Sequence, residues 1–353
     1  MNTSQILYKS INGGSLSRQE ALRLMNLRNA ENIFSLLSTA YKVKSKYFGN
    51  KIFLYGFIYF STYCRNSCKF CFYRSSNTKC PRYRKNIEEV VEIAKILKER
   101  GVHLVDLTMG EDPLIHSGRY DILVKLVKRV KEDVDISVMI SPGVLPRSVL
   151  RKLAKAGADW YALYQETHNR ELYSKLRVGQ DYDERMKAKL NAKEEGLLIE
   201  EGILIGVGET ETDRVNSVFV MKDIGAHQVR AMGFIPQPGT PMENVSCPPI
   251  LDEMKTIAIM RLVHKDRLIP ASLDIDGIKG LELRLIAGAN VITSIIPPNF
   301  ELKGVAQSEL GIDEGLRSVD GVRPYVERLG LSIASRREYE KWVENEKEEL
   351  SRK

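Results

Sequence analysis

Segments with the properties of buried strands alternate with segments of helical periodicity along most of this 353-residue chain. Residues 87–100, for example, carry apolar side chains at helical spacing, and Gly101 marks the end of that helix. The predicted strands are residues 52–59, 102–107, 136–140, 160–164, 202–207, 228–234, 268–273 and 291–295. Strands joined by helical crossovers pair in parallel, so eight such units predict an α/β fold, a closed (β/α)8 TIM-type barrel. An open, doubly wound parallel sheet is the alternative.

The segments that flank the repeating units predict two further regions. Ser17 and Glu20 have the spacing of a capping box, and helical spacing continues to about residue 48. Residues 1–50 are therefore expected to form an N-terminal helical cap, and residues 51–299 the barrel. Residues 300–353 are charge-rich and are predicted to form a C-terminal extension packed on the barrel.

Composition argues against several classes of protein. The chain is 43% hydrophobic, and no apolar run reaches the roughly 18 residues of a membrane span. Since the first residues lack the pattern of a signal peptide, we expect a cytoplasmic protein with no membrane partner. The formal net charge of +7 raises the question of nucleic acid, but the basic residues are interleaved with acidic ones on helix faces. We therefore expect no nucleic-acid partner, and a monomer is compatible with the sequence.

Three cysteines follow the first predicted strand with the spacing C-x3-C-x2-C, namely Cys64, Cys68 and Cys71. Strand ends of this kind carry the chemistry of a (β/α)8 barrel. A structural zinc site usually has four protein ligands, whereas a four-iron cluster is held by one thiolate per iron, so three thiolates leave one iron open. Aromatic neighbours such as Tyr63 and Phe70 shield such a cluster from water. A zinc site completed by a distant histidine, or an incidental group of thiols, is the alternative.

With Phe70 before the last cysteine, the motif resembles the signature of the radical S-adenosylmethionine (SAM) superfamily. In that superfamily the open iron binds the amino and carboxylate groups of SAM, and one electron from the cluster releases a 5′-deoxyadenosyl radical. The resemblance implies two cofactors, a 4Fe-4S cluster and S-adenosyl-L-methionine. It also implies a one-electron donor such as flavodoxin or ferredoxin. Because the radical comes from the cofactor, no protein side chain is expected to be catalytic in itself.

Other parts of the superfamily pattern lie at further predicted strand ends. Residues 109–112 resemble the Gly-Gly-Glu motif, with Met109 in place of the first glycine. Residues 202–209 resemble the Gly-x-Ile-x-Gly-x-x-Glu motif, with leucine for isoleucine, and Glu166 and Arg185 match by position. The resemblance implies that cofactor-binding residues are Tyr63, Phe70, Gly110, Glu111, Glu166, Arg185, Gly206 and Glu209, and that the metal ligands are Cys64, Cys68 and Cys71.

Within its biotin-synthase-like branch, the chain is most similar to the methylornithine synthase family of pyrrolysine biosynthesis. The similarity lies in residues 105–113, 162–167, 175–180, 268–274 and 287–290. That family isomerises L-lysine to (3R)-3-methyl-D-ornithine, so the resemblance implies L-lysine as the small-molecule substrate. Two alternatives remain, a biotin synthase or hydrogenase-maturation type of enzyme on another substrate, and a zinc-containing nucleic-acid-binding module. The isolated Cys80 and Cys247 are not expected to hold a second cluster.

Charged residues on the predicted strands support a diamino-acid substrate independently. Period-2 alternation with apolar neighbours turns Asp106 on strand two and Arg230 on strand six into the barrel. The same alternation turns Ser272 and Asp274 inward on strand seven. Two carboxylates and one guanidinium complement the two ammonium groups and one carboxylate of lysine. Family resemblance assigns Arg230 to the substrate carboxylate and Asp106, Ser272 and Asp274 to the amino groups. The alternative is an internal Asp106–Arg230 ion pair.

Overall fold

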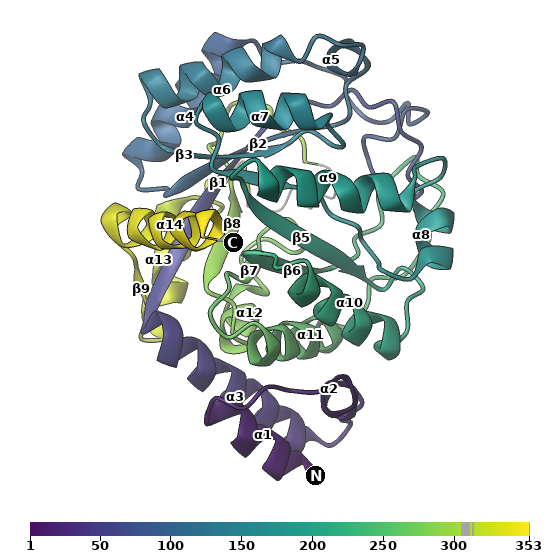
Figure 1. The fold of residues 1–353 in the computed structure, drawn as a ribbon, viewed down its shortest axis with the longest axis vertical. Coiled ribbons are helices and arrows are strands. Elements are labelled where there is room, and N and C mark those ends of the chain that lie inside the picture. Colours follow the sequence, from purple (N-terminus) through teal and green to yellow (C-terminus); the bar gives the residue numbers. More distant parts are fainter. Residues whose placement is uncertain (305–310, 313, 353) are drawn as a thin grey trace.

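Eight parallel strands form a nearly closed barrel in the computed structural model, which describes residues 1–304, 311–312 and 314–352 (Figure 1). The strands are β1 (Lys51–Ser61), β2 (Leu104–Met109), β3 (Ser137–Ser141), β4 (Trp160–Ala162), β5 (Leu198–Ile205), β6 (Gln228–Gly233), β7 (Pro270–Ser272) and β8 (Val291–Ile295). Their order is β6-β5-β4-β3-β2-β1-β8-β7. One parallel bridge between Gln228 and Leu268 joins β6 to β7 at their starts. The barrel is therefore closed at its N-terminal end, which confirms the α/β barrel prediction over the open sheet.

Helices connect the strands and cover the outside of the barrel (Figure 1). They are α4 (Ile87–Glu99), α5 (Pro113–His116), α6 (Asp121–Asp133), α7 (Arg147–Lys155), α8 (Arg170–Leu176), α9 (Tyr182–Glu194), α10 (Glu211–Asp223), α11 (Ile250–Val263) and α12 (Leu281–Ile286). Helix α8 is not anticipated from periodicity, because its 7 residues are too few to show a helical repeat. Strand β5 begins at Leu198 instead of residue 202, and its acidic pair Glu200 and Glu201 is fully buried.

Three N-terminal helices pack beside α10, α11 and α12 of the barrel (Figure 1). They are α1 (Thr3–Ile11), α2 (Arg18–Met25) and α3 (Ala30–Phe48). The predicted capping box is present at α2, where the Ser17 hydroxyl accepts from the Glu20 N–H and the Glu20 carboxylate accepts from the Ser17 N–H. Helix α3 lies against α11 through a buried apolar face that includes Leu36 and Ala40.

The C-terminal extension covers the N-terminal end of the barrel. It comprises α13 (Val319–Arg328), β9 (Ser332–Ile333) and α14 (Arg336–Ser351), and β9 pairs with the start of β1. From α14, the Tyr339 hydroxyl lies 3.2 Å from that of Tyr55, and Trp342 stacks on Trp160 with ring centroids 5.8 Å apart. Tyr55 and Trp160 lie near the starts of their strands, so α14 closes the end opposite to the strand ends that carry the cysteines. No described helix has the length and apolar character needed to cross a bilayer.

Candidate active site

The three cysteines line a cavity at the C-terminal end of the barrel that holds about 930 Å³ of empty space, including its open mouth. They lie in the loop after β1, which is tied to the end of α8 by a 2.9 Å hydrogen bond from the Lys69 N–H to the Leu176 carbonyl. Of the residues predicted to bind the cofactors, those that line this cavity are Cys64, Cys68, Cys71, Phe70, Gly110, Glu111, Glu166 and Arg185. Tyr63, Gly206 and Glu209 are not part of its lining. Residues far apart in sequence thus converge as a barrel site requires.

The environment of the thiols fits a multi-iron cluster. Burial and, to a lesser degree, the Cys68 thiol raise the pKa of Cys64 to about 11, and burial and the same neighbour raise that of Cys71. The thiolate forms of Cys64 and Cys71 are therefore unfavourable here without a cationic group beside them. Among the described residues, no three His, Cys, Asp or Glu side chains converge closely enough to share one metal ion. A cluster that takes one thiolate per iron does not need such convergence.

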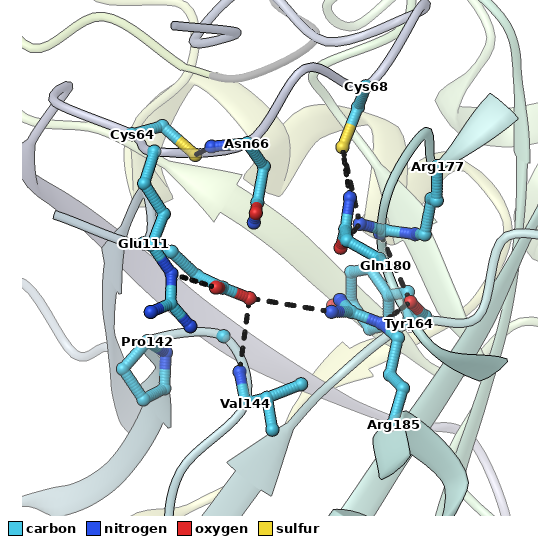
Figure 2. A network of polar contacts seen from close by, with 12 residues as sticks. Cys64, Asn66, Cys68, Glu111, Pro142, Val144, Tyr164, Arg177, Gln180 and Arg185 are labelled. Carbon is cyan, nitrogen blue, oxygen red and sulfur yellow. Dashed lines mark hydrogen bonds and ion pairs between the residues drawn. The ribbon is translucent and has the colours of Figure 1, made fainter. Parts of the chain in front are cut away.

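Glu111 forms one wall of the cavity and is surrounded by donors. Its carboxylate accepts from Arg65 Nε at 3.0 Å and from the Val144 N–H at 3.2 Å, and Arg185 Nη1 lies 3.7 Å away (Figure 2). Burial raises the pKa of Glu111, but Arg185 and the other donors outweigh it, so the pKa is lowered and the group is ionised. A Cβ on Gly110 would lie 2.3 Å from the Tyr63 carbonyl oxygen, so only glycine allows this close approach of the two loops.

Glu166 and Arg185 each leave a buried polar atom available. Glu166 has a left-handed backbone, with φ of 67°, and its Oε1 accepts from Arg177 Nη2 at 2.6 Å. Arg185 Nε donates to the Tyr164 carbonyl at 2.8 Å (Figure 2). Glu166 Oε2 and Arg185 Nη1 are buried and have no hydrogen bond with any described residue. Within the described part of the chain, Arg185 Nη1 has only the 3.7 Å ion pair with Glu111. An acceptor and a donor without hydrogen bonds at the cavity wall fit a bound polar cofactor, because buried polar atoms usually have a hydrogen-bond partner.

The remaining predicted cofactor residues shape the surroundings of the cavity. Glu209 accepts from the N–H groups of Gly206 and Val207, each at 2.8 Å, and from Arg214 Nε at 2.8 Å. These contacts hold the turn after β5, where Gly206 has φ of 89°. Tyr63 packs its ring against the Arg84 guanidinium at 3.8 Å. Direct contact of these three residues with a cofactor stays a prediction.

A buried polar layer lies inside the barrel below the cavity floor. The Ser141 hydroxyl, which lines the cavity, donates to Asp106 at 2.8 Å. Arg230 lies 5.5 Å from the ring centre of Tyr164, another lining residue. Arg230 Nε donates to Glu200 at 2.7 Å, and Nη2 is buried without a hydrogen bond to a described residue. Among the described residues, Arg230 thus forms its ion pair with Glu200, and no ion pair joins it to Asp106.

Asp274 is held by residues of its own chain on the other side of this layer. Its carboxylate accepts from the Tyr59 hydroxyl at 2.8 Å and the Ser294 hydroxyl at 2.7 Å, and it forms an ion pair with Arg317. The Ser272 hydroxyl accepts from the Asp274 N–H at 3.3 Å. The four predicted substrate residues thus lie within the barrel, but none lines the cavity directly.

Comparison with known proteins identifies the family. The sequence profile of the radical SAM superfamily matches residues 58–220. The 3-methylornithine synthase of Methanosarcina barkeri is 44% identical over 332 residues, which cover 94% of each chain. This chain belongs to the methylornithine synthase family of radical SAM enzymes. The crystal structure of methylornithine synthase (PylB) matches with a TM-score of 0.90 and 44% identity, over 96% of this chain and 99% of that one. The FeFe-hydrogenase maturase subunit HydE of Thermotoga maritima is 33% identical over 78% of each chain.

Membership of this radical SAM family confirms the expected cofactors, a 4Fe-4S cluster and SAM. The cavity described above is the part of the fold whose residues fit them. Two charged residues of the polar layer are not anticipated from the sequence. Glu200 is missed because the predicted strand begins at residue 202, and extending it to the apolar Leu198 would have included it. Arg317 is missed because no local pattern in the extension indicates a contact with Asp274, 43 residues away.

Proposed function

We propose that this chain is a radical SAM mutase that converts L-lysine to (3R)-3-methyl-D-ornithine, the first step of pyrrolysine biosynthesis. The observation that carries the substrate assignment is the charge of the polar layer below the cavity. It contains three carboxylates, Asp106, Glu200 and Asp274, and two guanidinium groups, Arg230 and Arg317. When Asp106 is ionised, the layer has one negative charge more than positive charges. Lysine, with two ammonium groups and one carboxylate, neutralises that excess.

The pairing of these charges indicates where the substrate binds. Glu200 pairs with Arg230 and Asp274 with Arg317, whereas Asp106 forms no ion pair with a described residue. We assign an ammonium group of lysine to Asp106, and the lysine carboxylate to the unpaired Nη2 of Arg230. Glu200 acts as a positioning residue that fixes the Arg230 side chain. Asp274 and Ser272 are assigned to the second amino group of lysine. Their oxygens accept hydrogen bonds from donors of the chain, and the remaining lone pairs would accept from the substrate.

The cavity above this layer supplies the binding site for the cofactors. In this proposal Cys64, Cys68 and Cys71 hold the cluster, and Glu111 and Arg185 bind the methionine part of SAM. The bound cofactors supply the radical that abstracts hydrogen from the substrate. The protein's own contribution is position and the exclusion of water, because the reacting atoms must be held about 3–3.5 Å apart. The floor residues Ser141 and Tyr164, which contact Asp106 and Arg230, link the two sites.

The reaction also needs an electron from outside the chain. We propose a one-electron carrier of the flavodoxin or ferredoxin type as the donor. Each of these carriers transfers single electrons at low potential, as reduction of such a cluster requires. Reduction of the cluster by either purified carrier, followed by SAM cleavage, tests this assignment.

The substrate assignment is tested with protein reconstituted without oxygen and supplied with SAM and dithionite. Lysine should yield an isomer of unchanged mass, detected by chromatography and mass spectrometry. Norleucine, which has the same chain length and lacks the side-chain ammonium group, is the matched control and should not be converted. Cleavage of SAM with no new isomer from lysine would contradict the proposal and favour another substrate, as in the HydE relative.

A further inference from the structure

We propose that Arg177 and Gln180 tune the reduction potential of the cluster by donating two hydrogen bonds to the Cys68 sulfur. Neither residue is among the metal ligands or cofactor-binding residues that the superfamily motifs indicate. The inference rests on the cluster that the family carries and is independent of which substrate the enzyme uses.

The two donors reach the same sulfur from the turn after α8. Gln180 Nε2 lies 3.0 Å from Cys68 Sγ, and Arg177 Nη1 lies 3.6 Å from it (Figure 2). Arg177 is buried, and its guanidinium lies 5.3 Å from the ring centre of Phe70. A second contact, from Nη2 to Glu166 Oε1 at 2.6 Å, fixes the side chain in this orientation. The positive charge is thus held beside the cysteine in a place with little water to screen it.

The other two cysteines lack such side-chain donors among the described residues. Cys64 Sγ accepts from the backbone N–H of Asn66 at 3.4 Å, and Cys71 has the backbone N–H of Tyr73 nearby. A backbone N–H is neutral, whereas a guanidinium carries a full charge, and charge-assisted hydrogen bonds are about twice as strong as neutral ones. Cys68 therefore receives the strongest stabilisation of negative charge in the group.

Stabilisation of negative charge on a ligand sulfur acts on the redox equilibrium of the cluster. One-electron reduction adds a negative charge, part of which resides on the sulfurs, so donors to a sulfur favour the reduced state and raise the potential. Removing the Arg177 charge should make the equilibrium constant for reduction about tenfold less favourable. For a one-electron couple this corresponds to a potential about 59 mV more negative.

The test is a redox titration of full-length protein, reconstituted without oxygen, without SAM or lysine, and followed by the paramagnetic resonance signal of the reduced cluster. Five proteins are compared, the wild type, Arg177→Met, Arg177→Lys, Gln180→Leu and Arg170→Gln. Arg170 is the matched control, because it is a cation at the start of α8, the helix that precedes Arg177, but is exposed and pairs with Asp183. Iron and sulfide analysis of each protein establishes that the cluster is complete before titration.

We expect Arg177→Met to lower the reduction equilibrium constant about tenfold and Gln180→Leu to lower it by a smaller factor. Arg170→Gln should match the wild type, and Arg177→Lys, which keeps the charge, should recover part of the loss. Equal potentials in the wild type and a fully loaded Arg177→Met protein would overturn the inference. If Arg177→Met fails to hold a cluster, the reduction potential of Gln180→Leu is the test. A Gln180→Leu potential equal to that of the wild type would then overturn the inference. Failure to convert lysine would leave these measurements unaffected.

Discussion

Asp106→Asn should make the protein more stable and at the same time weaken substrate binding. The reason is that the Asp106 carboxylate, which is proposed to bind the substrate, destabilises the folded protein when no substrate is bound. Asp106 is almost fully buried, with 1% of its surface exposed. Burial and, second, the nearby Glu200 carboxylate raise the pKa of Asp106 from its ordinary value of 3.8 to about 7. The difference between these two values, at about 1.36 kcal/mol per pKa unit, corresponds to about 4 kcal/mol. This is the free energy that ionisation of Asp106 costs the folded state relative to the unfolded chain.

The sign of the effect follows from the raised pKa. Below about pH 4 the carboxyl is protonated in both states and has no ionisation cost. As the pH rises from about 4 to about 7, the unfolded chain loses this proton and the folded protein keeps it, so stability falls. Asparagine does not titrate and can accept the same hydrogen bond from Ser141. Asp106→Asn should therefore stabilise the protein by about 4 kcal/mol at pH 8 and by about 2 kcal/mol at pH 5.5.

Denaturant unfolding of both proteins at pH 5.5 and pH 8 measures these differences, and calorimetry with lysine measures binding. The variant should bind lysine more weakly by about 1.5–3 kcal/mol, the range for a hydrogen bond to a charged group. Asp274→Asn is the matched control with the opposite sign, because it removes the carboxylate that pairs with the buried Arg317 guanidinium and should destabilise by about 3–5 kcal/mol. A destabilised Asp106→Asn protein at pH 8, or an equal effect at both pH values, would refute the argument.

Three further predictions concern other parts of the site. Lysine affinity of the wild type should fall about tenfold for each pH unit below 7, because Asp106 must lose its proton to pair with an ammonium group. Calorimetry between pH 6 and pH 8 measures this affinity, and an affinity that does not change with pH would contradict the prediction. Arg317→Gln should destabilise the protein by about 3–5 kcal/mol, because it removes one partner of a buried ion pair. In a double-mutant cycle measured by denaturant unfolding, adding Asp274→Asn should recover part of that loss. Additive losses of stability would count against the ion pair. Gly110→Ala should displace the cysteine loop, since its Cβ would meet the Tyr63 carbonyl at 2.3 Å. The rate of SAM cleavage should therefore drop sharply. A rate equal to that of the wild type would show that the loops tolerate a methyl group.

Much of this protein is determined by patterns that are local in the sequence. The alternation of buried strands and amphipathic helices predicts the barrel, because periodicity determines which face of each segment is buried. The spacing of Cys64, Cys68 and Cys71 within a few residues brings their thiols to one strand end in any barrel of this type. Side-chain alternation along β2 and β6 likewise turns Asp106 and Arg230 inward, as the contacts with Ser141 and Thr293 confirm.

The partners of these charges were decided by the tertiary structure alone. Glu200 pairs with Arg230 from a neighbouring strand, and Arg317 reaches Asp274 from the C-terminal extension. Glu209, which by resemblance faces the cofactor, uses its carboxylate to hold its own turn. An ion pair depends on the distance between two side chains in space, and residues far apart along the chain come together only when the whole barrel has closed. Local periodicity contains no information on that distance, so the sequence indicates which charges are buried and the fold determines which of them remain available for a substrate.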